Sequence, residues 1–117
     1  MTGHDALPRN WLSRRVAVVI DRPLGSTHPR HPDITYPINY GYIPNTLAGD
    51  LEPIDAYVLG VDVPVSSYFG EVIALVVRRD DVEDKLVVAP PGVRFTIDEI
   101  RDAVRFQEQF FDSEIVI

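Results

Sequence analysis

The sequence predicts a mainly β fold, in which a small closed or half-closed barrel carries one helix packed on it. Several short runs rich in β-branched residues lie before residue 90, and the long amphipathic pattern follows residue 95. With 117 residues, of which 45% are apolar, the chain is expected to form a single domain over 1–117 with a hydrophobic core of its own.

The first strand is expected at 14–21, where RRVAVVID is short and β-branched. Residues 1–12 carry no periodic pattern, so we expect them to be loosely ordered, with Trp11 as an anchor. Residues 22–37 contain four prolines, which exclude a helix and a central strand. An extended surface loop is therefore predicted there.

Three further strands are expected at 54–63, 70–79 and 85–90. The last two are joined by the charged stretch RRDDVEDK, for which a hairpin loop is the simplest connection. In the alternating run at 54–63, successive side chains point to opposite faces. One face carries Ile54, Ala56 and Val58, and the other carries Asp55, Tyr57 and Leu59.

One amphipathic helix is predicted at 97–112. Thr96 and Glu99 have the spacing of a capping box at its start. The apolar residues that follow at helical spacing predict packing against the barrel or a subunit contact, and they are Ile97, Ile100, Val104, Phe106, Phe110 and Phe111.

Composition excludes several classes of function. The chain has 11 basic and 18 acidic residues, and this net charge of −7 argues against a nucleic acid as main partner. It has no cysteine, which excludes disulfides and thiolate-bound metals. No apolar run approaches the roughly 20 residues that cross a bilayer, and the N-terminus lacks the apolar middle of a secretion signal. We therefore expect a soluble, cytoplasmic protein with no membrane partner.

The stretch YPINYGYIPNTLAGDLEPIDAYVLG at 36–60 places three acids close together, at Asp50, Glu52 and Asp55. With this spacing the three side chains cannot share one face of a helix or of a strand. A loop that runs into a strand can direct all three toward one point. If the Asp55 face is the barrel interior, its carboxylate needs a cation. A solvated loop is the plain alternative.

A second acidic cluster lies at the mouth of the predicted hairpin, with Asp80, Asp81, Glu83 and Asp84. If strands 54–63 and 70–79 pair, the two acidic loops meet at one end of the barrel. Converging carboxylates favour Mg²⁺, with Mn²⁺ as another possible ion, because hard cations take oxygen ligands. Such a site suits phosphoryl chemistry, for which the available cations are Lys85, Arg79, Arg78 and Arg30.

The run at 36–60 resembles the soluble, Mg-dependent inorganic pyrophosphatases. That family carries Tyr-Pro-x-Asn-Tyr-Gly-Tyr/Phe-Ile, and a D-x-D-P-x-D motif begins ten residues after the second Tyr. Here that Tyr is Tyr40, and Asp50 follows at the same distance. The resemblance implies an OB-like five-stranded barrel, hydrolysis of pyrophosphate or a related small diphosphate, and a homo-oligomer.

The resemblance also implies roles for individual residues. Glu52 stands where an acid activates the attacking water, and Tyr40 and Asp55 lie beside it in the catalytic site. Lys85 and Arg30, with Tyr40, match positions that bind phosphate. The implied metal ligands are Asp50, Asp55, Asp80, Asp84 and Asp21, with Asp81 and Glu83 left open as alternatives in the shortened hairpin loop.

Some positions depart from the family pattern. Glu52 replaces Asp, Leu51 stands where small residues are usual, and Glu114 and Ile115 occupy the place of a phosphate-gripping Tyr-Lys pair near the C-terminus. These departures favour an alternative, a pyrophosphatase-like module that binds metal or phosphate with little or no turnover. An oligonucleotide binder follows from fold analogy alone, and the net charge opposes it.

Overall fold

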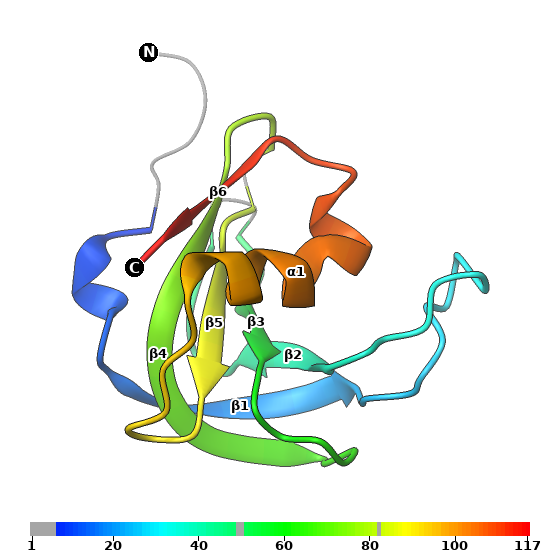
Figure 1. Ribbon diagram of the computed structural model, residues 1–117, viewed down its shortest axis with the longest axis horizontal. Coiled ribbons are helices and arrows are strands. Elements are labelled where there is room, and N and C mark those ends of the chain that lie inside the picture. The colour runs from blue at the N-terminus through cyan, green and yellow to red at the C-terminus, as the bar shows by residue number, and fades with distance from the viewer. Residues whose placement is uncertain (1–6, 49–50, 82) are drawn as a thin grey trace.

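The computed structural model describes residues 7–48, 51–81 and 83–117. Five strands close into a barrel: β1 (Arg15–Arg22), β2 (Asn39–Ile43), β3 (Ile54–Val58), β5 (Lys85–Ala89) and β4 (Ser67–Arg78), which pairs back to β1. Neighbouring strands are antiparallel except β3 and β5, which are parallel. The helix α1 (Ile97–Glu108) lies across the outside of this barrel (Figure 1). The predicted mainly β barrel with five strands and a C-terminal helix is confirmed.

The barrel wall separates two apolar layers. Inside the barrel, Val18, Ala56 and Leu86 belong to a cluster to which each of the five strands contributes. Outside it, Tyr57 and Val87 pack with Ile100 of α1 in a second cluster. The Asp55 face of β3 therefore looks toward the helix side of the wall, and the possibility that this face lines the barrel interior is wrong.

Strand pairing differs in part from the expectation. The alternation at 54–63 ends early, because β3 stops at Val58. The hairpin between β4 and β5 is confirmed, but β3 pairs with β2 and β5 rather than with β4. Two strands were not predicted from the sequence: β2 and the short β6 (Ser113–Val116), which pairs with the edge of β4 beyond β1.

The proline-rich connection between β1 and β2 is an extended loop, as predicted, and it projects from the barrel (Figure 1). Its two arms are joined by an isolated bridge between Thr27 and Thr35. The buried side chain of Asn39 ties the base of the loop to the barrel. Its Oδ1 accepts from the Leu24 N–H at 2.9 Å, and its Nδ2 donates to the Val63 carbonyl at 3.0 Å.

Gly41 is required where β2 crosses β1. A Cβ at this position would lie 1.8 Å from the Val19 carbonyl oxygen, which no side chain can accommodate. The glycine between Tyr40 and Tyr42 thus allows the close approach of the two strands that holds Tyr40 in place.

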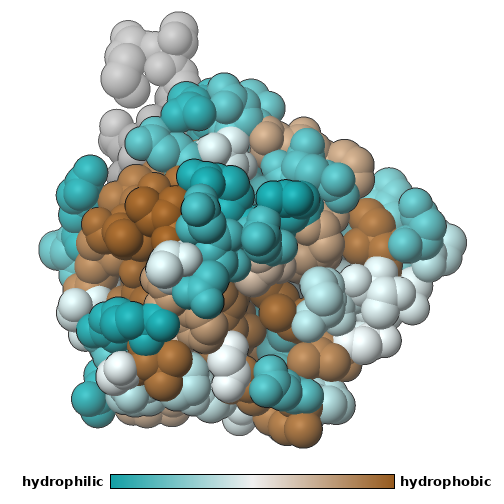
Figure 2. Space-filling view, viewed as in Figure 1, coloured by the Kyte–Doolittle hydropathy of each residue, from teal (hydrophilic) through white to brown (hydrophobic). Residues whose placement is uncertain are grey.

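Within the N-terminal stretch that was expected to be loosely ordered, Arg9–Trp11 form the short 3-10 helix η1. Trp11 packs against the barrel interior cluster, and the Arg14 guanidinium carbon lies 4.2 Å from the centre of its ring. Figure 2 shows hydrophilic side chains over the outward face of α1. In the described part of the chain, no helix is both long enough and apolar enough to cross a membrane.

The capping box at the start of α1 is confirmed. The Thr96 hydroxyl accepts from the Glu99 N–H at 3.1 Å, and the Glu99 carboxylate accepts from the Thr96 N–H at 2.8 Å. The helix ends at Glu108 rather than at 112, and Phe110 then lies exposed in the turn that follows.

Replacing Thr96 by Ala should lower the free energy of unfolding by about 1 kcal/mol, because the Glu99 N–H loses its partner. Urea denaturation followed by circular dichroism measures the change. Thr96→Ser keeps the hydroxyl and should recover most of it. An unchanged midpoint in Thr96→Ala would contradict a stabilising role for the cap.

Candidate functional site

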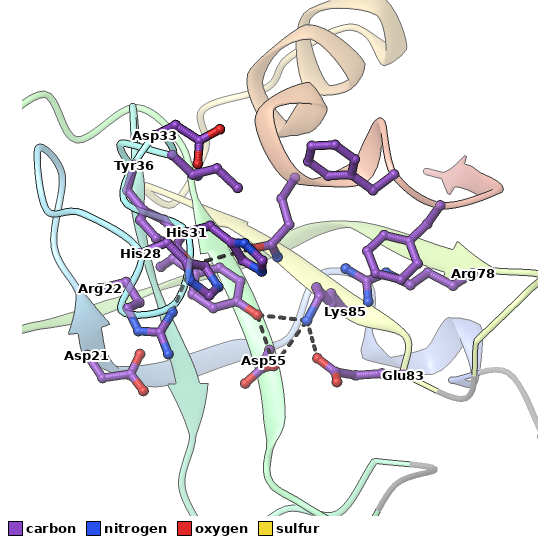
Figure 3. A pocket seen from close by; sticks show the side chains of 15 residues that line it. Asp21, Arg22, His28, His31, Asp33, Tyr36, Asp55, Arg78, Glu83 and Lys85 are labelled. Atoms are coloured by element: carbon purple, nitrogen blue, oxygen red, sulfur yellow. Dashed lines mark hydrogen bonds and ion pairs between the residues drawn. The ribbon is translucent and has the colours of Figure 1, made fainter.

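A cavity of about 580 Å³ opens between the C-terminal end of α1, the β1–β2 loop and the outer wall of the barrel (Figure 3). It combines charged side chains, two imidazoles and aromatic rings. The residues that line it are Asp21, Arg22, His28, His31, Asp33, Ile34, Tyr36, Tyr40, Asp55, Arg78, Glu83, Lys85, Gln107, Phe110 and Phe111.

The ammonium group of Lys85 forms the base of the cavity, although the residue is only 1% exposed. It donates to the Tyr40 hydroxyl at 2.7 Å and to Asp55 Oδ2 at 3.0 Å, and it contacts Glu83 Oε1 (Figure 3). An ammonium group has three N–H donors, and these three acceptors use all of them. The cation that accompanies the acids in this structure is thus a lysine.

Strand register explains why these side chains meet. Tyr40 and Tyr57 are paired across β2 and β3, and Ala56 is paired with Leu86 across β3 and β5. One residue before that pair, Asp55 and Lys85 are therefore neighbours on the same face of the wall. The Tyr40 hydroxyl reaches diagonally to Asp55 and donates to its Oδ2 at 2.9 Å.

The site keeps Tyr40 in its protonated form. Burial, together with the negative charges of Asp55 and Glu83, raises the pKa of Tyr40 well above its ordinary value. Tyr40 can therefore donate to Asp55 while it accepts from Lys85, and it cannot act as a base at neutral pH. Within the described residues, Lys85 and Tyr40 both engage Oδ2 of Asp55.

Carboxylates gather in a second hollow of about 310 Å³ on the other side of Asp55. Four of them line it, namely Asp21, Glu52, Asp55 and Glu83. This set of oxygen donors is of the kind that hard divalent cations take. In the described part of the chain, however, no three acidic or imidazole side chains stand close enough together to hold an ion.

The residues expected at the site are only partly brought together. Tyr40, Asp55 and Lys85 share one cluster, with Glu52 and Asp21 at the adjacent hollow. Arg30 is exposed on the loop and does not line the cavity. Asp50 lies outside the described residues.

The hairpin acids need correction. Asp84 is buried, and its oxygens accept from the backbone N–H groups of Arg78 and Leu7, both at 3.0 Å. Asp80 accepts from the Asp112 N–H at 3.1 Å, away from the cavity. Glu83, which the sequence left open as an alternative, faces the site. Side chains alternate along an extended chain, so Glu83 shares the face of Lys85 and Asp84 points the opposite way.

A buried ion pair closes the cavity beside the end of α1. Arg78 donates to both carboxylate oxygens of Glu108, from Nη2 at 2.7 Å and from Nε at 3.1 Å. Tyr57 donates to the same carboxylate at 2.5 Å, and Ser113 also contacts it. The second Arg78 amino group donates to Asp81 at 3.2 Å.

These contacts determine the ionisation of Glu108. Burial opposes its negative charge, but the hydrogen bonds from Arg78, Ser113 and Tyr57 outweigh burial and hold the pKa of Glu108 below its ordinary value. The folded protein therefore keeps this carboxylate charged inside the structure, where it fixes the end of α1 to the barrel wall.

Glu108 and Arg22 were not predicted as site residues, although the sequence carries a signal for Glu108. Glu108 lies four residues after Val104 and eight after Ile100, on the buried stripe of α1. A carboxylate on an apolar helix face indicates a buried partner. Arg22 donates to the Tyr36 hydroxyl at 2.9 Å and gives the cavity a further cation, which no pattern in the sequence marks.

Comparison with known families agrees with the resemblance read from residues 36–60. The family model described as inorganic pyrophosphatase matches residues 17–113. The chain is 36% identical over 70 residues to the inorganic pyrophosphatase of Mesorhizobium japonicum, a match that covers 57% of this chain and 40% of that protein. It is 30% identical over 91 residues to that of Rickettsia felis, covering 74% and 49%. The chain thus spans less than half the length of these two relatives.

Solved structures show the same fold. Inorganic pyrophosphatase from Ehrlichia chaffeensis superposes with a TM-score of 0.66 at 21% identity, covering 97% of this chain and 88% of that one. The Thermus thermophilus enzyme superposes with a TM-score of 0.60 at 19% identity, covering 100% and 86%. At such identities the likeness establishes the barrel architecture.

Breaking the buried ion pair should be costly. Glu108→Ala leaves the Arg78 guanidinium buried without its carboxylate, so we expect the free energy of unfolding to fall by about 3–5 kcal/mol. Combining Glu108→Leu with Arg78→Met removes both charges and should be less destabilising. As a control, Asp112→Asn breaks the exposed pair with Arg79 and should move the urea midpoint little. If Glu108→Ala were as mild as Asp112→Asn, the pair would not anchor the helix.

The same carboxylate should contribute to acid denaturation. Because the pKa of Glu108 is lowered in the folded protein, its contribution to stability is complete above the ordinary value of 4.5 and is lost as pH falls below it. Urea midpoints measured from pH 7 to pH 3 should therefore drop more steeply for the unmodified protein than for Glu108→Gln. Parallel curves would contradict the inferred shift.

Proposed function

The chain belongs to the inorganic pyrophosphatase family, and from this membership we propose that it hydrolyses pyrophosphate, or a related small diphosphate, to phosphate in a reaction that depends on a divalent cation. The observation that carries the proposal is the position of Asp55. Its Oδ2 is held by Lys85 and Tyr40, and the same carboxylate borders the hollow lined by Asp21 and Glu52.

The residues at this hollow fit a hard cation in chemical type. Asp21, Glu52, Asp55 and Glu83 offer oxygen donors, and Mg²⁺ or Mn²⁺ are the ions that prefer them. The family motif implies Asp50 as a further ligand. When bound, such an ion neutralises phosphate charge and favours ionisation of an attacking water.

The protein's own side chains supply the remaining functions. Lys85 and Arg22 provide positive charge for a phosphate in the cavity, and Tyr40 orients Asp55. Because all three donors of Lys85 are in use, an incoming phosphate replaces Glu83 on its ammonium group and releases that carboxylate toward the hollow. Glu52 is the candidate general base that takes a proton from the attacking water.

A second candidate function is binding without turnover, and β6 favours it. Glu114 and Ile115 occupy the place where the family motif has a Tyr-Lys pair, and they pair with Val77 and Val76 of β4. Glu114 accepts from Arg79 at 2.8 Å, so this strand brings a carboxylate rather than a phosphate-binding cation. A homo-oligomer and a cytoplasmic location belong to the same proposal as expectations from the sequence and the family.

Phosphate release from pyrophosphate in the presence of MgCl₂ tests the proposal. We expect steady turnover that chelation abolishes and added Mg²⁺ restores. Asp55→Asn should lower kcat by about 100-fold or more, because the charge that borders the hollow is lost. Asp102→Asn, an exposed change on α1, is the matched control.

Circular dichroism establishes that Asp55→Asn remains folded. If neither pyrophosphate nor any small diphosphate releases phosphate, the proposed enzymatic activity is refuted. Calorimetry would then decide for the binding module if Mg²⁺ and pyrophosphate bind without being turned over.

A further inference from the structure

Phe110 does not take part in the packing of α1 against the barrel. The sequence predicts it on the buried stripe, yet it is 64% exposed and lines the large cavity. Ile100 and Val104 are the fully buried contacts of α1 with the barrel, and Phe106 packs beside them. A large apolar side chain at the rim of a polar cavity indicates a surface available to a ligand.

The turn that carries Phe110 is anchored. Its N–H donates to the Gln107 carbonyl, and the Phe111 N–H donates to the Glu108 carbonyl. The Phe111 ring also lies against Arg78, whose guanidinium carbon is 3.6 Å from the ring centre. Arg78 belongs to β4 and is paired with Glu108 in the interior. The turn with Phe110 and Phe111 is therefore fixed to the barrel wall.

Imidazole rings from the β1–β2 loop form another side of the same cavity (Figure 3). The rings of His28 and His31 have centroids 4.8 Å apart, and His28 is stacked on Tyr36 at 6.2 Å with an interplanar angle of 10°. Burial and the nearby charge of Arg22 lower the pKa of His28, so its ring is uncharged near neutral pH. Flat rings therefore line this side of the cavity.

Positive charge, in contrast, is scarce. Lys85 is engaged by Asp55, Glu83 and Tyr40, and Arg78 is engaged by Glu108 and Asp81. Among the described residues, Arg22 is the cation of this cavity without a carboxylate partner. The cavity can thus bind a phosphate at its base, near Lys85 and Arg22, while the rings of its walls can stack on a planar group.

We propose that the substrate is an organic diphosphate that carries a flat ring, of the nucleoside diphosphate class, with its phosphates at Lys85 and Arg22 and its ring against Phe110 and the imidazoles. This inference rests on the proposed function. In the reaction, the oxygen of water forms a bond to the terminal phosphorus, and the bond from that phosphorus to the bridging oxygen breaks. The bridging oxygen stays with the monophosphate ester, inorganic phosphate is the second product, and a proton is released to solvent.

Three substrates with Mg²⁺ test the proposal: ADP, methyl diphosphate and pyrophosphate. Stacking of a base on an aromatic side chain should make kcat/KM for ADP about tenfold or more higher than for methyl diphosphate. In Phe110→Ala the ratio of these two values should fall toward one. Phe69→Ala is the matched control, because Phe69 is 61% exposed on β4 and does not line the cavity, and it should keep the ratio.

The outcomes separate the two proposals. If pyrophosphate is hydrolysed and ADP has no advantage over methyl diphosphate, the ring site is refuted and the proposed function stands. If no compound releases phosphate, the proposed function fails, and calorimetry with methylene-bridged analogues decides the ring site. The ring site is supported if the methylene-bridged ADP analogue binds more tightly than methylenediphosphonate, and if this difference is lost in Phe110→Ala and kept in Phe69→Ala. Equal binding of the two analogues overturns the ring site.

Discussion

A positive charge buried against the barrel wall is the constraint on which the candidate site depends. An ammonium group removed from water needs acceptors for all its protons, and Lys85 obtains them from Tyr40 on β2, Asp55 on β3 and Glu83 before β5. Three separate parts of the chain must therefore arrive at one point before this residue can be buried. The same requirement holds Asp55 and Glu83 in place, since both accept from the buried ammonium group.

Much of the architecture could be predicted because local patterns and tertiary structure agree. β-branched runs became β1, β4 and β5, and the capping box marks the first turn of α1. The missed strands have a physical reason. Asn39–Ile43 is buried on nearly all sides, so its sequence shows no alternation between apolar and polar residues. β6 is four residues long and forms because the edge of β4 beyond β1 offers unpaired backbone groups.

Candidate site residues could be predicted from the sequence where the family motif gives their type and spacing. They could not be predicted where the direction of the side chain decides which residue faces the cavity. Tyr40, Asp55 and Lys85 lie together as the family motif implies. The family match implies Asp80 and Asp84 as metal ligands of the hairpin and leaves Asp81 and Glu83 as alternatives, whereas the alternation back from Lys85 selects Glu83. Glu108 and Arg22 depend on contacts between distant segments, and only the folded arrangement of α1 and the β1–β2 loop brings them to the cavity.

The separation of the barrel interior from the layer under α1 has an evolutionary consequence. The cluster around Val18, Ala56 and Leu86 closes the barrel by itself, and the cavity draws its side chains from the other surface of the same strands. Substitutions at the exposed parts of the cavity, such as Phe110 and His31, can then occur while the barrel stays folded, because these residues do not belong to the inner cluster. Ligand preference can in this way change on the same barrel.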